Sequence, residues 1–265
     1  MKTLAKSLLR TLLPAAIFAR LSAISARRFI QEIERRRGLD KLNRDYVAKY
    51  GRRVLQGPFK GMEYSPMTDG RHVGARLAGC YELELNDAVE RCCNTPYASV
   101  IDVGCAEGYY AVGFARRIPG AEVTAFDTDP WARRACGTIA EANGVSARIH
   151  LDGYCSPAGL RSAIGAGRTL IVLDCEGYEA VLLDPHSIPE LARCDLIVEL
   201  HDAPPAPDHP LVAKFRESHE IELITGRPRT GAEVEMLRDL PPSERLRLID
   251  ELRQPWQGWA VLWAK

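Results

Sequence analysis

The chain has 265 residues, which is enough for one substantial hydrophobic core with a small appended segment. Its 35 basic and 35 acidic residues cancel in number, but they are unevenly distributed along the chain. Residues 1–60 hold 15 Lys and Arg against 4 Asp and Glu, a net charge of +11, so the remainder carries −11. An acidic body argues against nucleic acid as a general partner, whereas the basic N-terminal segment suits an anionic surface.

The eight cysteines form no C-x-x-C pair. Several fall in expected strands or helices, where a free cysteine behaves as a small apolar side chain. This usage predicts a reduced, cytoplasmic compartment. The cysteines are Cys80, Cys92, Cys93, Cys105, Cys136, Cys155, Cys175 and Cys194.

Residues 1–50 are predicted to form a basic, amphipathic helical arm ahead of a body at 51–265. Within residues 1–37, Pro14 ends or kinks a first helical segment, and Gly38 is expected to close the helix. Three interpretations of this segment stay open: a secretory signal, a helix lying on an anionic membrane surface, or a helix packed on the body or on a partner subunit. The interrupting Arg10 and the cysteine usage disfavour the signal. No apolar run reaches the roughly 18–20 residues that a membrane span needs.

Two short elements are expected between the arm and the first buried strand, a hairpin at 54–64 and a helix at 82–94. Tyr81 and Glu82 stand at the start of this helix. An acid suits a helix N-terminus, so the residue types favour a capping role, but both side chains could instead line a cofactor pocket.

From residue 99 onward strands alternate with helices, which predicts an α/β fold with a doubly wound, mostly parallel, Rossmann-like sheet. Expected strands lie at 99–103, 122–126, 148–151, 169–173, 195–200, 220–224 and 259–263. Expected helices lie at 109–117, 130–143, 157–164, 210–218 and 243–252.

Each of the first five expected strands ends in or next to an acid, and the carboxyl ends of parallel strands meet at one edge of a sheet. Asp is also common in turns and helix caps, which accounts for Asp152 but not for Asp102 or Glu199, because the latter two lie before the turn or within the strand. The acids at the strand ends are Asp102, Asp127, Asp152, Asp174 and Glu199. The pattern predicts a group of carboxylates at this edge.

The first of these strands runs through Gly104 and Gly108 into a helix, a tight turn that brings backbone close to a nucleotide-like cofactor. Asp127 closes the next strand about 20 residues later, where an acid can bind both ribose hydroxyls. The turn has the spacing G-x-A-x-G instead of G-x-G-x-x-G, and no P-loop Lys-Ser/Thr follows. Ala106 is expected to need only a small size, not a positive φ. The acid at Asp102 disfavours a pyrophosphate and favours a cation.

On these residues a family resemblance can be stated. Val100-Ile-Asp-Val-Gly-Cys-Ala-Glu-Gly108 and Ala125-Phe-Asp127 resemble the first two motifs of class I S-adenosylmethionine-dependent methyltransferases. Leu173-Asp-Cys-Glu-Gly-Tyr-Glu179 resembles the D-x-E-G-x-E motif of the FkbM-like group, and residues 79–82 and 197–201 also look like segments of it. The resemblance covers about residues 54–224 and the closing strand. It implies S-adenosylmethionine as cofactor and a seven-stranded sheet whose last strand is antiparallel.

The resemblance also implies which residues surround the cofactor. The turn would pass beneath the methionine part with Asp102 near its amino group, Asp127 would bind the ribose, and Asp152 and Gly153 would lie by the adenine. The cofactor-binding residues expected in this way are Tyr81, Glu82, Asp102, Gly104, Cys105, Ala106, Gly108, Asp127, Thr128, Asp152 and Gly153.

The expected catalytic residues are Asp174, Glu176, Glu199 and His201, at the ends of the fourth and fifth strands. Methyl transfer needs an aligned acceptor, removal of its proton and exclusion of water. His201 or Glu199 could accept that proton, while Glu176 orients the acceptor. Carboxylates and an imidazole also suit a divalent metal, although none is assigned, and His201 could instead be a hydrogen-bonded loop histidine.

The sequence therefore predicts an S-adenosylmethionine-dependent methyltransferase, with O-methylation of a small-molecule or sugar-like hydroxyl as the preferred reaction. N-methylation is one alternative, because a neutral amine needs less help from a base. A non-catalytic cofactor-binding module docked through the arm is another, and a nicotinamide dehydrogenase is more distant. Besides the small-molecule acceptor, a peripheral membrane or protein contact is expected through residues 1–37.

Overall fold

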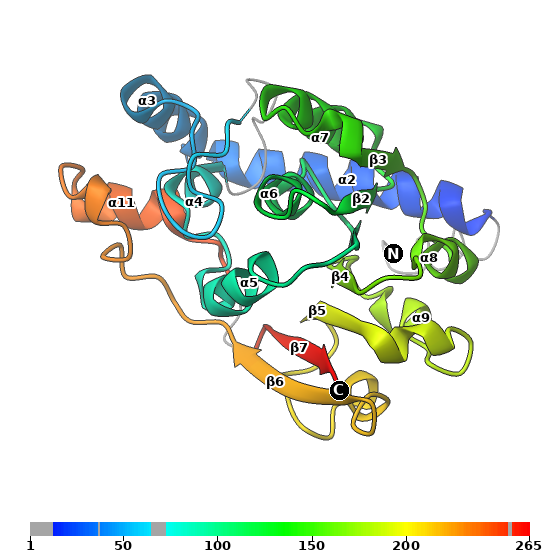
Figure 1. Ribbon diagram of the computed structural model, residues 1–265. Helices are drawn as coiled ribbons and strands as arrows, with labels where there is room; N and C mark the ends of the chain where they lie inside the picture. The colour runs from blue at the N-terminus through cyan, green and yellow to red at the C-terminus, as the bar shows by residue number, and fades with distance from the viewer. Residues whose placement is uncertain (1–12, 37, 65–72, 254–255) are drawn as a thin grey trace.

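The computed structural model describes residues 13–36, 38–64, 73–253 and 256–265, and it places helices on both faces of one sheet (Figure 1). The strands are β1 (Ser99–Val103), β2 (Glu122–Phe126), β3 (Ile149–Asp152), β4 (Thr169–Leu173), β5 (Cys194–Leu200), β6 (His219–Thr225) and β7 (Gly258–Ala264). The helices are α2 (Ala15–Arg36), α3 (Leu39–Tyr50), α4 (Val73–Ala78), α5 (Asn86–Cys93), α6 (Tyr109–Arg117), α7 (Pro130–Ala142), α8 (Pro157–Ala163), α9 (Glu179–Leu182), α10 (Pro210–Ala213) and α11 (Pro242–Ile249).

The sheet has the strand order β3-β2-β1-β4-β5-β7-β6. Strands β1 to β5 run parallel, and β7 is antiparallel to both β5 and β6. This confirms the predicted mostly parallel, seven-stranded, Rossmann-like sheet with an antiparallel last strand. The order reverses between β1 and β4, and a crevice for ligands is expected outside the carboxyl ends of the strands at such a switch point.

Successive residues of the central strands face opposite layers of helices. Val100 belongs to the apolar cluster that includes α5, α6 and α7, and Ile101 to the cluster that includes α8, α9 and α10 (Figure 1). Because side chains alternate along a strand, Asp102 points to the side of Val100, toward α6. By the same rule, Glu199 shares the face of Ile197 on β5. Asp102 and Glu199 therefore lie on the same side of the sheet.

Several predicted boundaries are corrected. The helix expected at 82–94 is a short 3-10 turn (Leu83–Leu85) followed by α5, and the helix expected at 210–218 is only α10. The His219 N–H donates to the Phe215 carbonyl at 2.8 Å, so a turn leads directly into β6. The expected hairpin is confirmed by a bridge between Arg53 and Glu63.

The two N-terminal helices differ in how they pack. Gly38, with φ 69°, ends α2 as predicted and directly precedes α3. Three residues of α3 are buried, Leu39, Leu42 and Tyr46, whereas none of the described side chains of α2 is fully buried. Residues 1–12 lie outside the described part, and the division of the chain at residue 50 stays a prediction. Among the described residues, no helix is both long and apolar enough to cross a membrane.

Candidate functional site

The turn after β1 can form only because two of its residues lack a side chain. Gly104 has φ 89°, and a Cβ there would lie 1.7 Å from the carbonyl oxygen of Asp174. Gly108 has φ 94° at the start of α6, and its Cβ would lie 2.5 Å from Cys136 Sγ. The turn therefore packs directly against the backbone that follows β4. Cys105 between them is buried.

Asp127 holds two backbone segments together at the end of β2. Its Oδ2 accepts the N–H of Ala106 at 2.9 Å, and its Oδ1 accepts the N–H of Asp129 at 2.7 Å. Ala106 has φ 46°, so the prediction that this position needs only a small size was wrong: the residue is left-handed. Burial raises the pKa of Asp127 to about 6, against the effect of these two N–H groups. A carboxylate oxygen can accept more than one hydrogen bond, so the ribose-binding role stays a prediction.

Helix α2 contacts the residues next to Asp127. The Thr128 hydroxyl donates to the Ala19 carbonyl at 3.4 Å, and Arg27 Nε lies 2.6 Å from Asp129 Oδ2. The Arg27 guanidinium also stacks over the Trp131 ring, 5.2 Å from its centroid. The arm therefore reaches the loop after β2, where the sequence predicted cofactor-binding residues.

The loops after β3 and β4 are joined by two tyrosines. The hydroxyls of Tyr154 and Tyr178 are 2.5 Å apart, and both rings are half-buried. Asp152 is exposed, and its Oδ1 accepts the N–H of Gly153 at 2.6 Å. The expected adenine-side residues thus lie at the open end of β3, and their contact with adenine stays a prediction.

Asp102 is buried below the turn, with 3% of its surface exposed. Its Oδ2 accepts the Ala111 N–H at 2.9 Å, which ties β1 to α6. Burial raises the pKa of Asp102 to about 8, and the charges of Asp174, Asp127 and Glu82 act in the same direction. This carboxyl group therefore lies in a region that already carries negative charge.

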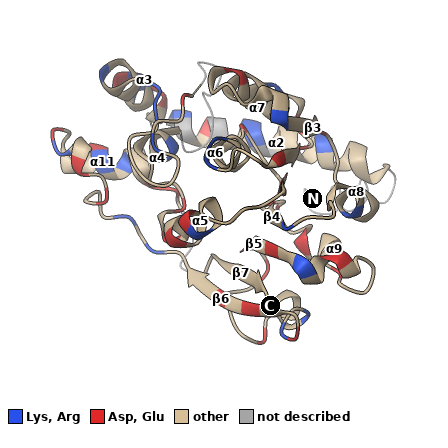
Figure 2. Ribbon diagram, in the orientation of Figure 1, with Lys and Arg blue, Asp and Glu red and all other residues tan. Residues whose placement is uncertain are grey.

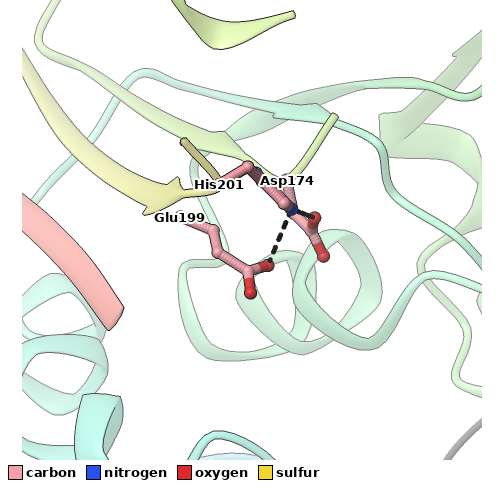
Figure 3. Close-up of side chains that lie close together, drawn as sticks. All are labelled: Asp174, Glu199 and His201. Atoms are coloured by element: carbon pink, nitrogen blue, oxygen red, sulfur yellow. Dashed lines mark ion pairs between the residues drawn. The ribbon is translucent and has the colours of Figure 1, made fainter. Parts of the chain in front are cut away.

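The four predicted catalytic residues meet around one imidazole, and Figure 3 shows three of them, Asp174, Glu199 and His201. His201 Nε2 lies 3.4 Å from Asp174 Oδ1, 3.6 Å from Glu199 Oε2 and 3.9 Å from Glu176 Oε2. On the other side of the ring, Nδ1 lies 3.1 Å from Glu179 Oε1, although it is not aligned for a hydrogen bond. Glu179 Oε1 instead accepts the Cys175 N–H at 2.8 Å. The expected group of acids around His201 is thus present.

The protonation of this cluster follows from its charges. Burial disfavours a charged imidazole, but the carboxylates of Asp174, Glu179 and Glu199 outweigh burial and raise the pKa of His201 to about 11. Burial, followed by the charges of Asp174 and Glu82, raises the pKa of Glu199 to about 9. His201 therefore carries a proton at neutral pH, so the imidazole is not free to accept one.

The same atoms could hold a metal ion. One ligand atom each from Asp174, Glu199 and His201 lies within 4.8 Å of the other two. An imidazole with carboxylates is a donor set that several divalent metals accept. The neutral imidazole that a metal needs is disfavoured by the high pKa of His201, so a metal would have to displace a tightly held proton.

Glu82 does not cap the following helix, contrary to the preferred interpretation of the sequence. No side-chain hydrogen bond caps that turn, and Glu82, with φ 48°, is buried. Its carboxylate accepts hydrogen bonds from the Tyr110 hydroxyl at 2.5 Å and from Arg253. Arg253 also donates to Glu199 Oε1 at 2.6 Å and to Glu251 Oε2 at 3.0 Å. Glu82 thus belongs to a charged network that reaches the catalytic cluster.

Tyr81 packs beside this network. Its ring centroid lies 5.3 Å from that of Tyr109, and the Arg76 guanidinium lies 4.3 Å above the ring. Arg76 in turn forms a buried ion pair with Glu107 of the turn. Tyr81 thereby links the turn after β1 to the Arg253 network, and its contact with a cofactor stays a prediction.

Sequence reasoning missed Arg253, the residue that holds Glu82 and Glu199 together. It lies 54 positions from Glu199 along the chain and follows Leu252, which has φ 57°. No spacing rule connects positions so far apart, and the left-handed turn that aims this side chain has no glycine to mark it. Only packing could have identified it.

The described side chains that cluster at this edge of the sheet include more carboxylates than cations. Asp174 raises the pKa values of Glu82, Asp102 and Glu199, and Glu82 raises those of Asp102 and Glu199. Arg253 and His201 are positive groups in direct contact with these carboxylates. Arg253 is also shared with Glu251. A positively charged ligand would relieve this imbalance, which fits the sulfonium and amino groups of S-adenosylmethionine.

Fold and site together define an α/β protein with a glycine turn on one side of its topological switch point and a cluster of carboxylates on the other. No protein-family model matches the chain. Two curated relatives match part of it, and both are named release factor glutamine methyltransferase. The protein from Gloeobacter violaceus is 34% identical over 117 residues, which covers 43% of this chain and 36% of that protein. The protein from Chlorobaculum tepidum is 35% identical over 97 residues, 34% of this chain and 33% of that protein. The match spans about a third of the length of each relative.

Solved structures of methyltransferases are also similar. A methyltransferase from Geobacter sulfurreducens with S-adenosyl-L-homocysteine covers 69% of this chain and 90% of its own, at 16% identity and a TM-score of 0.40. Coclaurine N-methyltransferase covers 68% of this chain and 70% of its own, at 14% identity and a TM-score of 0.40. At these scores the fold assignment rests on the strand order of the sheet itself. The narrower resemblance to the FkbM-like group stays a prediction.

Proposed function

We propose that this protein is an S-adenosylmethionine-dependent methyltransferase that binds its cofactor at the switch point between β1 and β4. The observation that carries the proposal is the excess of carboxylates over cations beside a glycine turn at the carboxyl edge of the sheet. The names of the two curated relatives support the same activity. Gly104, Ala106 and Asp127 would form the donor side.

The chemistry divides between cofactor and protein. S-adenosylmethionine supplies a methyl group already activated on a sulfonium. When a hydroxyl is the acceptor, the O–C bond forms as the C–S bond breaks, and the hydroxyl proton must leave. His201 already carries a proton, so we assign the proton acceptor to Asp174, whose side chain is 38% exposed and faces Nε2. His201 and Glu199 then position that carboxylate, in place of the base role expected from the sequence.

The acceptor is proposed in two forms. The carboxylate and imidazole cluster suits a hydroxyl on a small molecule, because such a group needs a base. The names of the relatives favour a different acceptor, a glutamine side chain in a protein. We retain the hydroxyl as the first candidate on the chemistry of the cluster, and the protein amide as the second on the relatives.

Cofactor binding is tested by titration calorimetry with S-adenosylmethionine. Asp127→Ala should lower the affinity at least about tenfold, because it removes a charged hydrogen-bond acceptor. Glu122→Ala is the matched control, since it removes an exposed acid from the opposite end of the same strand. Equal affinities in the two variants, with unchanged circular dichroism, would refute the ribose assignment. An unaltered chain that binds no S-adenosylmethionine would refute the proposed function as a whole.

The acceptor is tested by mass spectrometry after incubation with unlabelled S-adenosylmethionine, a metabolite extract and, separately, candidate proteins. The acceptor should gain about 14 Da, the increment of one transferred methyl group. Asp174→Asn should slow a hydroxyl transfer by about a hundredfold or more while cofactor binding persists. A glutamine-containing peptide as the methylated species would select the second acceptor. Cofactor binding without turnover on any acceptor would favour a non-catalytic module.

A further inference from the structure

Helix α2 presents large apolar side chains to solvent. Ile17 is 49% exposed, Leu21 is 52% exposed and Phe29 is 67% exposed. At about 100° per residue, positions 17, 21 and 28 lie within about 40° of one another on the helix surface. Ile17 and Leu21 therefore lie on one face, and Phe29 flanks it. We call this surface the outer face of α2.

The same face carries positive charge. Arg20, Arg28 and Arg35 are exposed, and the helix sequence contains five arginines against two glutamates. Blue segments lie along α2 in Figure 2. Of these acids, Glu32 is paired with Arg35 at 2.8 Å. The outer face thus combines exposed apolar side chains with an excess of cations.

The opposite side of the helix is fixed to the body. Ala19 lies about 200° from Ile17 around the axis, and its carbonyl accepts the Thr128 hydroxyl. Arg27, on the flank of the helix about 80° from Ile17, is held by Asp129 and by the Trp131 ring. With this side anchored, the outer face points away from the body, as it must if it is to meet a large flat partner.

We propose that the outer face of α2 docks on an anionic lipid bilayer, with the helix lying in the plane of the surface. Apolar side chains flanked by arginines are the composition of helices that lie in the membrane interface. Each exposed arginine is attracted to anionic headgroups, whereas a purely apolar protein partner would give no role to these charges. The sequence ahead of the helix repeats the pattern, with Leu4, Leu8 and Leu12 interleaved with Lys2, Lys6 and Arg10. This inference does not depend on the proposed transferase activity.

The test is sedimentation of the full chain with vesicles. The unaltered protein should co-sediment with vesicles made of equal amounts of phosphatidylcholine and phosphatidylglycerol, and not with phosphatidylcholine alone. Binding should fall as salt is added, because salt screens the attraction of arginines to headgroups. The double variant Ile17→Asp/Leu21→Asp should bind at least about tenfold more weakly, since two apolar side chains no longer enter the interface.

Met236→Asp is the matched control, because Met236 is 53% exposed on a segment outside α2. It should bind vesicles as the unaltered chain does, and circular dichroism should show that both variants are folded. Equal binding to both vesicle types, or unchanged binding of the double variant, would overturn the proposal. The proposal would also be overturned if the unaltered chain did not bind vesicles and light scattering found it to be a dimer, while the double variant was a monomer. The outer face would then be a protein interface.

Discussion

The candidate site has two sides that are built in different ways. The donor side is the glycine turn with Asp127, and the acceptor side is the cluster around Glu199 and His201. On the donor side, Gly104 allows a tight turn, and the two carboxylate oxygens of Asp127 accept backbone N–H groups from Ala106 and Asp129, which lie a few residues from a strand end. On the acceptor side, His201 lies against Asp174 from the loop after β4, and Glu199 is paired with Arg253 from the segment after α11. Arg253 also pairs with Glu82 from the loop before α5. The first side is set by local turns, and the second by long-range charge pairing.

This difference has a physical consequence. Backbone N–H groups donate hydrogen bonds to Asp127 without adding net charge, so the donor side depends on backbone geometry more than on ion pairs. The acceptor side relies on buried ion pairs, whose desolvation cost is recovered only when every partner is present. We therefore expect the donor side to be sensitive to shape and the acceptor side to be sensitive to charge.

The largest effect is expected where the two sides touch. Gly104→Ala would place a Cβ 1.7 Å from the Asp174 carbonyl oxygen, so the free energy of unfolding should fall by at least about 5 kcal/mol. Gly177→Ala is the matched control, because Gly177 has φ 95° and nothing lies within 4 Å of its Cβ position. This control should cost only about 1–2 kcal/mol of left-handed strain. Denaturant unfolding measures both, and similar losses would mean that close approach is not what fixes the turn.

The second effect tests whether charge governs the acceptor side. Arg253→Met leaves Glu82, Glu199 and Glu251 without their shared partner, and should lower the free energy of unfolding by about 4 kcal/mol. Arg161→Met removes the partner of Glu190 from an ion pair in which Arg161 is 55% exposed, and should cost less than about 1 kcal/mol. Denaturant titration compares the two variants. If Arg253→Met lowered the free energy of unfolding as little as Arg161→Met does, ion pairing would not be what stabilises the acceptor side.

The third effect is a pH dependence that arises between the two sides, at Asp102. Its pKa of about 8 lies above that of an unfolded aspartate, so the stability it contributes is present at low pH and is lost as the pH rises toward 8. Between about pH 6 and pH 8 this group should remove about 2 kcal/mol of unfolding free energy. Asp102→Asn keeps an acceptor for the Ala111 N–H and does not titrate. Thermal unfolding across this pH range should therefore be flatter in the variant, and parallel curves would show that Asp102 is ionised throughout.

The smallest effect concerns the attachment of α2 to the donor side. Arg27→Ala removes an ion pair in which Arg27 is 28% exposed, and should lower the free energy of unfolding by about 1 kcal/mol or less. Amide hydrogen exchange should speed up across α2 and leave the sheet unchanged. Arg28→Ala, an exposed neighbour, is the control and should leave exchange unaltered. Equal protection in both variants would mean that Arg27 does not hold the helix on the loop after β2.

The acids at the strand ends illustrate how far the sequence predicts the site. The periodic apolar runs predicted all seven strands to within one or two residues, and the rule that parallel strands share a carboxyl edge predicted the cluster around His201. The same patterns misjudged Glu82, because an acid before a helix looks like a cap whether or not an arginine lies opposite. The sequence patterns also failed at Ala106. Glycine is the residue type that signals a left-handed backbone, so an alanine in that conformation gives no such signal.

The sequence by itself determined the sheet, the glycine turn and the position of each acid along its strand, because these depend on local periodicity and on alternation of side chains. Only the tertiary structure decided the charges. Arg253 reaches Glu82 and Glu199 by a fold that brings distant segments together, and the neighbouring carboxylates keep a proton on His201. A pKa depends on every charge within a few ångströms, and those neighbours are set by packing and not by position in the chain.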